Sequence, residues 1–584
     1  MAVRKGRYWL LPAILLISLL LNSCSRENGT QISTTKPSPS SPQNSPSQTT
    51  SPVFEDTATS TATPTFLPVE EEKIPSEDRG VIVFSMGDGG HQHLFAYHPN
   101  YLPITRLTAG EWDDRDPAIS PDGNYMAFTS NRSGQWDLYL WDLGINAITA
   151  LTNTVEFEAD PDWSPDNQWI TYESYVNGQS NIRIRSVFDD SAAPIQLTEN
   201  AGNNIDPSWS PLGRQISFST NRSGKYEIWT TQLDSVENRF SKLTGNNDFD
   251  YINPAWSPDG LSIAWEKRND YSTIEMLPSA TSTDSPTPLG VGSMPFWSPD
   301  GETVLSRYDT PDQYFLTGYN ANNGNIVYPL IGLAALTSPF QWAAGNSLEN
   351  LNNILVSSDF PENLQLCQSI QTIPTSDNGR FSMVELESVR AENPFLSDMA
   401  DECYVALRNS VEKVVGWDVL GNLKSAALPI TASPDPGVPQ NWLYTGRAIM
   451  LSLAPFDSNW MAVSREDFEG QTYWRLWAKC LAQDGSCGTI LTAPVWDFAS
   501  RSTGDLQAFE DGGKLIPPPS GYWIDLTDFA HQFGWYRLAS LSNWRTYYPG
   551  IQFNLLVFSE GKTWEQAMRE LYPDDAINLV REGK

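Results

Sequence analysis

The chain has few basic residues and very few histidines for its length. Its 584 residues include 37 Lys and Arg against 70 Asp and Glu, which gives a formal net charge of −33. Because nucleic-acid binding needs a basic surface that neutralises phosphates, this balance argues against a nucleic-acid partner. Only four histidines are available as candidates for acid–base catalysis or metal binding: His91, His93, His98 and His531.

Several motifs of enzymes are also missing. No Gly-x-Ser-x-Gly occurs, so the nucleophile turn of a serine hydrolase has no candidate, and no Gly-rich phosphate loop is present. The pair His91 and His93 and the carboxylates Asp113, Asp114 and Asp116 could collect a cation, but they lack the ligand spacing of a metal-binding loop. We therefore predict no catalytic residue, no cofactor and no metal site.

One eight-residue phrase returns along the first half of the chain. Its copies are DPAISPDG, DPDWSPDN, DPSWSPLG, NPAWSPDG and MPFWSPDG, and a decayed copy, PFQWAAG, begins at Pro339. The apolar runs between the copies predict four short antiparallel strands per unit, which is the size of one propeller blade. The first prolines of the five copies, with the Trp that follows in four of them, are Pro117, Pro161 with Trp163, Pro207 with Trp209, Pro254 with Trp256, and Pro295 with Trp297.

We interpret the phrase as architecture rather than as a catalytic motif. Ser-Pro-Asp-Gly suits a tight turn, and the recurrent Trp offers a large surface for stacking one blade on the next. Residues 80–108 read as three strands without a leading one, and the copy at Pro339 supplies it, so the ring closes with six blades. Arg132 and Arg222 are expected to brace the turns of their blades.

Repeats such as NPAWSPDG…IAWEK and DPAISPDG…MAFTSNRSGQWDLYLWD resemble those of the TolB family of six-bladed β-propellers, over about residues 80–350. The resemblance implies a mainly β fold and an envelope-associated binding role. Related propellers also cap prolyl-oligopeptidase-type hydrolases, but the nucleophile motif of such a hydrolase is absent here.

The N-terminus has the pattern of an export signal. MAVRKGRYWLLPAILLISLLLNSC begins with basic residues, continues as an apolar run and ends in LNSC, which resembles a bacterial lipobox with Cys24 as the lipidated residue. A simple signal peptide or an uncleaved anchor is the alternative. Residues 25–79 are rich in Ser, Thr and Pro and predict a disordered tether. We expect an extracytoplasmic protein of the bacterial cell envelope, held to the membrane by its N-terminal lipid.

Helix and strand patterns mix after the repeats end. The sequence predicts an α+β domain over 359–584, which follows a signal with lipobox at 1–24, a tether at 25–79 and a propeller at 80–358. Within it, NWLYTGRAIML at 441–451 resembles the zinc-binding segment of D-Ala-D-Ala carboxypeptidases. Leu443 and Met450 stand where that family has metal ligands, which implies that no zinc is held.

Apart from Cys24, cysteine occurs only in this predicted domain. In an oxidising compartment four such cysteines favour two disulfides. Three pairings are open, and a zinc site is the alternative. The Asp484-Gly485 turn predicts that two strands of a hairpin bring one pair together, which leaves the other two cysteines for each other. The expected pairs are Cys480 with Cys487 and Cys367 with Cys403.

The sequence thus favours a binding or scaffold protein that presents its propeller to a protein, peptide or cell-wall ligand. An envelope hydrolase acting on peptidoglycan or glycan is one alternative, because two facing carboxylates in the C-terminal domain would suffice for glycoside chemistry. A sensor of a small ligand is a second alternative. The missing catalytic motifs favour a protein that is not an enzyme.

Overall fold

The computed structural model describes residues 80–581, except for 352–366, 368–379 and short gaps at 89, 200–201, 236, 246–247, 269–270, 279–284, 312, 336, 344–346, 348–349, 434–436 and 439. The described residues belong to one compact unit that begins at Glu72. The predicted lipidation site, the tether and the predicted domain boundary after residue 358 lie outside the described residues.

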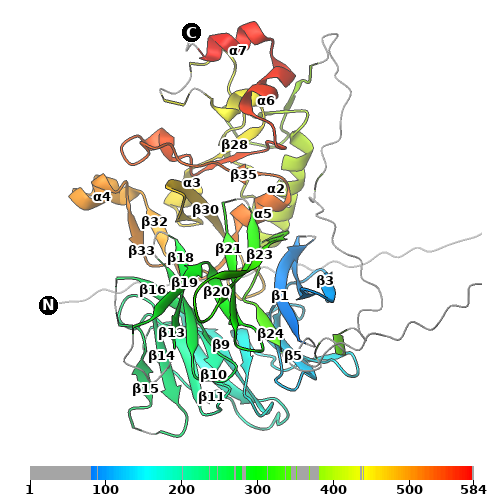
Figure 1. Cartoon of the computed structure of the whole chain (residues 1–584). Coiled ribbons are helices and arrows are strands. Elements are labelled where there is room, and N and C mark those ends of the chain that lie inside the picture. Colours follow the sequence, from blue (N-terminus) through cyan, green and yellow to red (C-terminus); the bar gives the residue numbers. More distant parts are fainter. Residues whose placement is uncertain are drawn as a thin grey trace, which may run out of the picture. The chain divides into compact units, whose positions relative to one another are not determined.

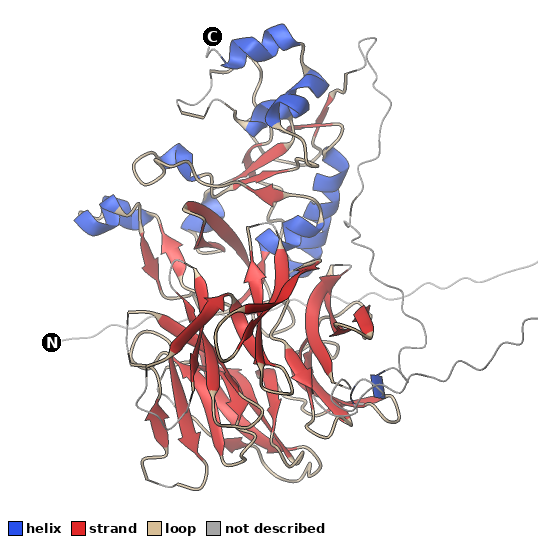
Figure 2. Ribbon diagram, in the orientation of Figure 1, coloured by secondary structure: helices blue, strands red, loops and turns tan. Residues whose placement is uncertain are grey.

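Between Val81 and Ala343, the described residues form six four-stranded antiparallel sheets, which confirms the predicted propeller (Figures 1 and 2). Blades I–III contain β24 (Gln341–Ala343), β1 (Val81–Asp88), β2 (His91–His98), β3 (Leu102–Arg106); β4 (Asp114–Ile119), β5 (Tyr125–Ser130), β6 (Asp137–Asp142), β7 (Ala147–Ala150); and β8 (Phe157–Trp163), β9 (Trp169–Val176), β10 (Gln179–Ser186), β11 (Ile195–Gln196). Blades IV–VI contain β12 (Asn204–Trp209), β13 (Gln215–Thr220), β14 (Glu227–Gln232), β15 (Phe240–Lys242); β16 (Asp250–Trp256), β17 (Ile263–Arg268), β18 (Ser272–Leu277), β19 (Thr287–Val291); and β20 (Ser293–Trp297), β21 (Thr303–Asp309), β22 (Tyr314–Asn320), β23 (Ile326–Leu333).

Blade I joins the two ends of the ring. Its inner strand β24 comes from the decayed copy of the repeat and pairs with β1 through Val81 and Ala343. In that copy Gln341 occupies the position of the recurrent Trp. Its side-chain amide hydrogen-bonds both the N–H and the carbonyl of Ile119 in blade II. Gln341 in place of Trp therefore joins the closing blade I to blade II through two hydrogen bonds.

The residue before each repeat proline forms a β-bulge. Asp116, Asp160, Asp206, Asn253 and Met294 have φ of 50–52°, and the register of the inner strand shifts at each of them. Asp and Asn adopt this left-handed conformation more readily than other side chains with a Cβ. The recurrent Asp-Pro or Asn-Pro thus specifies a bulge, a feature that the sequence analysis did not assign to it.

The recurrent tryptophans lie between blades. The indole N–H of Trp163 donates to the carbonyl of Ala118, 2.9 Å away in the preceding blade, and that of Trp297 donates to Ala255 at 3.0 Å. Trp209 departs from this pattern, because its indole donates to Gly213 in its own blade. Each of these side chains is buried.

The C-terminal region, residues 380–581, has the predicted α+β character. Its two larger sheets have the strand orders β27-β28-β36-β35 and β29-β30-β34-β31. Its elements are β25 (Met383–Glu385), β26 (Phe395–Ser397), α2 (Asp401–Val415), β27 (Leu423–Ser425), η2 (Trp442–Thr445), β28 (Ala448–Leu451), α3 (Ala454–Asp457), β29 (Met461–Phe468), β30 (Gln471–Lys479), β31 (Thr489–Ile490), β32 (Val495–Asp497), η3 (Ala499–Ser502), α4 (Leu506–Glu510), β33 (Lys514–Ile516), β34 (Tyr522–Asp525), α5 (Leu526–Gln532), β35 (Tyr536–Arg537), η4 (Tyr548–Ile551), β36 (Leu555–Val557), α6 (Trp564–Leu571) and α7 (Asp574–Arg581).

Two helix ends in this region follow from their local sequence. Helix α2 ends at Gly416, whose φ of 81° is the left-handed conformation that glycine adopts easily. Helix α6 begins with a capping box in which Thr563 and Gln566 each bind the other's backbone N–H. None of the helices within the described ranges is both long and apolar enough to cross a membrane.

The structure contains the two predicted disulfides, Cys367–Cys403 and Cys480–Cys487. The predicted hairpin between Cys480 and Cys487 is wrong. Strand β34 lies between β30 and β31 and pairs with both, so these two strands are not direct neighbours. The short separation of the two cysteines in the sequence suggested a hairpin. The strand that lies between β30 and β31 is β34, which begins more than thirty residues after β31.

The segment that resembles zinc carboxypeptidases forms η2 and β28. Leu443 is buried among Ala448, Leu555 and Val557, and Met450 packs against the same cluster. The two positions that hold metal ligands in that family therefore lie in apolar packing here, which offers a metal no oxygen, nitrogen or thiolate ligand.

Candidate functional site: the propeller channel

A cavity of about 390 Å³ lies within the ring and is lined by the inner strands of all six blades. Since these strands run in the same direction around the ring, equivalent repeat positions form layers. One layer contains the bulge residues Asp116, Asp160, Asp206, Asn253 and Met294. The next layers contain the repeat prolines, the tryptophans Trp163, Trp209, Trp256 and Trp297, and the second prolines Pro121, Pro165, Pro211, Pro258 and Pro299.

The mouth of this channel lies at the Ser-Pro turns. Pro121, Pro211 and Pro258 line the cavity and are exposed to solvent, so that end of the cavity reaches the surface. Gly80, the first described residue, lies against Trp342 and Ala343, which also line the cavity. The chain therefore enters the ring at the face that carries the mouth.

Carboxylates surround this mouth. Asp122, Asp166, Asp259 and Asp300 each follow a lining proline and are exposed. Each accepts a hydrogen bond from the serine two residues before it, at 2.5–2.6 Å. The bond from Ser257 lowers the pKa of Asp259. In Asp122 burial is the largest single effect and raises the pKa, but the hydrogen bonds from Ser120 and Asn124 together outweigh it, so the pKa is lowered. The rim consequently carries fixed negative charge at neutral pH.

Three further carboxylates meet at the channel wall, and two of them, Asp160 and Asp206, line the cavity. Asp160 of β8, Glu173 of β9 and Asp206 of β12 bring one oxygen each to within 4.8 Å of one another. Oxygen ligands of this kind suit a hard divalent cation such as Ca²⁺, and equally the charged group of a cationic side chain. The sequence does not reveal this cluster, because its residues come from three strands of two blades and share no local motif.

The inner carboxylates also hold neighbouring blades together. Glu173 accepts the backbone N–H of Asp206 at 2.7 Å, Asp206 accepts that of Asn253 at 3.1 Å, and Glu266 accepts that of Met294 at 3.2 Å. In each case the donor is the bulge residue of the next blade. The bulge frees an N–H from the strand ladder, and a carboxylate of the preceding blade satisfies it.

Burial and mutual repulsion keep protons on this cluster. Burial, followed by the charge of Glu173, raises the pKa of Asp160 well above its usual range. Burial, followed by the charge of Asp206, has the same effect on the pKa of Glu173. Burial raises the pKa of Asp162 to about 6, although Asp162 accepts the backbone N–H of Trp209 and of Trp163. A bound cation would favour the ionised form of these groups.

The other residues considered from the sequence lie away from the channel interior. His91, the first residue of β2, has its Nδ1 3.4 Å from an oxygen of Asp113, which directly precedes β4. His93 is buried nearby, and its Nδ1 is without a hydrogen-bond partner among the described residues. Arg132 binds Asp114 at 2.6 Å and Arg222 binds Asn204 at 3.1 Å, so both arginines brace their blades as predicted.

The C-terminal region contacts the propeller at the ends of the blades opposite the mouth. Its contacts involve Gly87 in blade I, Trp136 in blade II, Phe157 and Tyr175 in blade III, and Pro311 in blade VI. Each of these residues lies at the start of an inner strand or beside the turn between the second and third strands. The mouth at the Ser-Pro turns is therefore on the other face.

One carboxyl pair in the C-terminal region bears on the hydrolase alternative. Burial, then a hydrogen bond with Glu402, raises the pKa of Asp401 to about 7. The two residues are adjacent in the first turn of α2. Glycoside hydrolysis needs two carboxyl groups that flank a bond from opposite sides, about 5–9.5 Å apart. Neighbours on one helical turn do not provide that arrangement.

Comparisons with known proteins agree with the propeller. Residues 176–331 match the family model described as TolB beta propeller domain, so the chain contains TolB-like propeller repeats. An uncharacterised protein of Agrobacterium fabrum is 31% identical over 142 residues, which cover 21% of this chain and 47% of that protein. The chain thus spans about half the length of the curated relative that it matches.

Solved propellers show low identity to this chain. TolB from Acinetobacter baumannii is 19% identical, with a TM-score of 0.40, and the match covers 46% of this chain and 68% of that one. A putative TolB from Agrobacterium tumefaciens is also 19% identical, with a TM-score of 0.33, over 41% of this chain and 97% of that one. A puromycin-hydrolysing peptidase of Mycobacterium tuberculosis is 15% identical, with a TM-score of 0.32, over 41% of each chain.

Proposed function

We propose that this TolB-like propeller belongs to a lipid-anchored, extracytoplasmic binding protein, and that the channel mouth receives a cationic segment of a partner protein. The observation that carries the proposal is the channel itself. It is a cavity of about 390 Å³ with proline and tryptophan walls, an exposed carboxylate rim and a carboxylate cluster at its wall. Cavities of roughly 300–1,000 Å³ suit a small ligand or a short chain segment.

Charge and shape both support a cationic segment. The rim aspartates are negatively charged, so their field attracts a basic group and repels an acidic one. A cationic head inside the channel would favour the ionised form of the inner carboxylates and so strengthen its own binding. The prolines and tryptophans are stiff side chains that present apolar surface without a large loss of rotamer freedom on binding. A Lys or Arg side chain combines an apolar stem with a charged head. The stem can pack on the proline and tryptophan layers while the head reaches the carboxylates.

The anchor rests on the lipobox-like LNSC, and Cys24→Ser provides its test. We expect the serine variant to be exported and to move from the membrane fraction to the soluble fraction, because the acceptor for the lipid is lost. Fractionation followed by immunoblotting measures this. A serine variant that stays on the membrane after removal of its signal peptide would show that the lipid is not the anchor.

The mouth is tested by neutralising its rim. Replacing Asp122, Asp166, Asp259 and Asp300 by Asn should reduce capture of a partner from a solubilised envelope fraction at least tenfold, because four charges of the attracting field are lost. The matched control neutralises four exposed acidic residues of the C-terminal region, which contacts the face opposite the mouth, and changes the net charge equally: Glu385, Glu387 and Glu510 to Gln and Asp575 to Asn. Capture is quantified by mass spectrometry against the unmodified protein.

The outcomes separate the candidate functions. Loss of one captured protein in the rim variant but not in the control supports the proposal, and that protein should bind the purified propeller protein directly. Equal capture by both variants contradicts it. Capture of glycan fragments with cleavage would instead favour the envelope hydrolase, and binding of a small molecule without any protein would favour the sensor.

A further inference from the structure

A disulfide of the C-terminal region lies beside the residues that contact the propeller. Cys480 follows β30, Cys487 precedes β31, and their Cα atoms are 6.0 Å apart. Between these strands lies β34, in which Trp523 pairs with Lys479 on one side and with Thr489 on the other. The bond therefore joins two strands across the start of a third.

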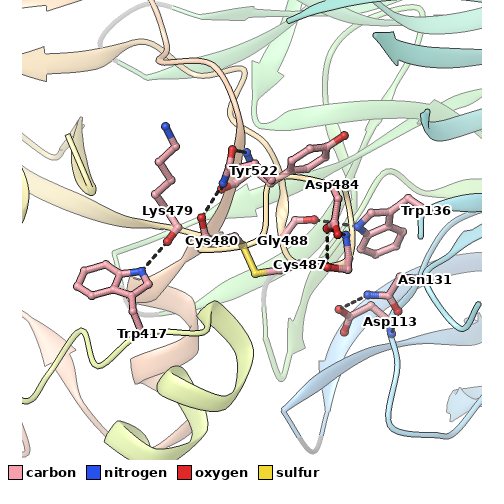
Figure 3. The surroundings of a disulfide bond; sticks show 12 residues. Asp113, Asn131, Trp136, Trp417, Lys479, Cys480, Asp484, Cys487, Gly488 and Tyr522 are labelled. Atoms are coloured by element: carbon pink, nitrogen blue, oxygen red, sulfur yellow. Dashed lines mark hydrogen bonds between the residues drawn. A yellow bond between two sulfur atoms is a disulfide. The ribbon is translucent and has the colours of Figure 1, made fainter. Parts of the chain in front are cut away.

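Residues next to this bond contact blades II and III. Figure 3 shows Gly488 beside Trp136 of blade II. The carbonyl of Gly488 accepts a hydrogen bond of 2.9 Å from the indole N–H of Trp136, which is 1% exposed. The ring of Tyr522 packs against Phe157 and Tyr175, with centroids 5.7 and 6.0 Å apart. These propeller residues and the two cysteines belong to one buried apolar cluster.

The bridged cysteines fix the positions of both contacting residues. Cys487 is covalently next to Gly488, and the N–H of Cys480 donates to the carbonyl of Tyr522 at 3.0 Å. Although most of the loop between the cysteines is exposed, the Cys480 sulfur and Gly488 are closely packed. Cys480 is fully buried, and a Cβ on Gly488 would lie 2.9 Å from the Cys480 sulfur and 2.4 Å from the carbonyl oxygen of Trp523.

Reduction would disturb this packing. Two thiols in van der Waals contact need much more space than the roughly 2.05 Å of a sulfur–sulfur bond. Since Cys480 is held on the sheet by Tyr522, the displacement falls on Cys487 and Gly488. The Gly488 carbonyl then leaves the Trp136 indole, whose buried N–H would be left without its hydrogen-bond partner, which is unfavourable.

We propose that the Cys480–Cys487 disulfide is a latch, and that its oxidation docks the C-terminal region on blades II and III. The step is thiol–disulfide exchange with a small-molecule or protein disulfide. One cysteine thiolate attacks that oxidant and releases one thiolate, and the second cysteine thiolate then attacks the mixed disulfide and releases the other. The pair loses two protons and two electrons, and the oxidant becomes two thiols. The chain thus docks once it is in an oxidising compartment.

The second disulfide offers a matched control. Cys367–Cys403 ties residue 367 to α2, whereas the hydrogen bond between Gly488 and Trp136 lies beside the Cys480–Cys487 bond. Hydrogen exchange of the full-length protein is followed in three forms: unmodified, C480S/C487S and C367S/C403S. The latch peptides cover 131–137, 155–159, 486–490 and 519–523, and the reference peptides cover 204–209 and 250–256 in blades IV and V.

We expect C480S/C487S to exchange at least tenfold faster in the latch peptides, with the reference peptides unchanged. C367S/C403S should leave the latch peptides slow. The reduced unmodified protein should behave like C480S/C487S and regain slow exchange after treatment with oxidised glutathione.

Two results would overturn the proposal. One is slow exchange in the latch peptides of C480S/C487S, which would show that docking does not need the bond. The other is fast exchange throughout C480S/C487S, blades IV and V included, which would show a general stabiliser rather than a latch. A third variant, Trp136→Phe with the disulfide intact, should speed exchange in the 486–490 peptide alone, and unchanged exchange there would also count against the mechanism.

Discussion

Replacing Trp256 by Ala should lower the free energy of unfolding by about 3–5 kcal/mol, the usual cost of truncating a buried large aromatic side chain. Trp256 belongs to β16 of blade V and is 7% exposed. It packs in one cluster with Ile228 of blade IV and with Ile263 and Trp265 of its own blade. The side chain therefore bridges two blades, and alanine would leave a cavity at their junction.

Packing should account for the whole of this loss. Within the described part of the chain, the indole nitrogen of Trp256 has no hydrogen-bond partner, so the substitution breaks no polar contact. The control is Leu261→Ala in the following turn. Leu261 is 59% exposed, and its truncation should change stability by less than about 0.5 kcal/mol. Urea unfolding of both variants measures the difference, and equal small losses would show that Trp256 does not bridge the blades.

The repeat made the propeller predictable. Its period, its turn residues and its regularly placed tryptophans gave the number of blades and the split blade I, because each blade must bury its faces on identical neighbours. The bulge at Asp116 and its equivalents was not foreseen. Asp-Pro can be read as a turn as well as a bulge, and only the shifted register of the strand pairs distinguishes the two.

The candidate site was only partly predictable. Asp160 and Asp206 belong to the repeated phrase, but Glu173 lies within β9 in an ordinary strand pattern. These carboxylates meet because neighbouring blades bring inner strands together, which is a long-range contact without a local sequence signal. The C-terminal region has no repeat, so its helices were predictable from caps and periodicity, whereas the position of β34 between β30 and β31 was not.

The channel carboxylates should make the protein more stable at pH 5 than at pH 8. Their pKa values are raised in the folded state, so the folded chain retains protons that the unfolded chain loses above about pH 4. The contribution of these groups to stability is therefore fully present below the pKa of the unfolded chain. It falls as pH rises and is lost once the pH has passed the folded-state pKa of each group. For Asp162, whose pKa is raised to about 6, the loss is on the order of 3 kcal/mol.

Asp160→Asn should flatten this dependence. Asparagine tolerates the left-handed backbone of this position and removes the charge that Glu173 and Asp206 face. In buffer with a chelator, we expect a gain on the order of 1–3 kcal/mol at pH 8 and almost none at pH 5. The control is Asp190→Asn. The side chain of Asp190 is 93% exposed, so losing its charge should change the free energy of unfolding by the same amount at pH 5 and at pH 8. Urea unfolding at the two pH values measures these changes. If Asp160→Asn instead lowers stability at pH 8 with the chelator present, a contact that the fold itself supplies must stabilise the ionised carboxylate.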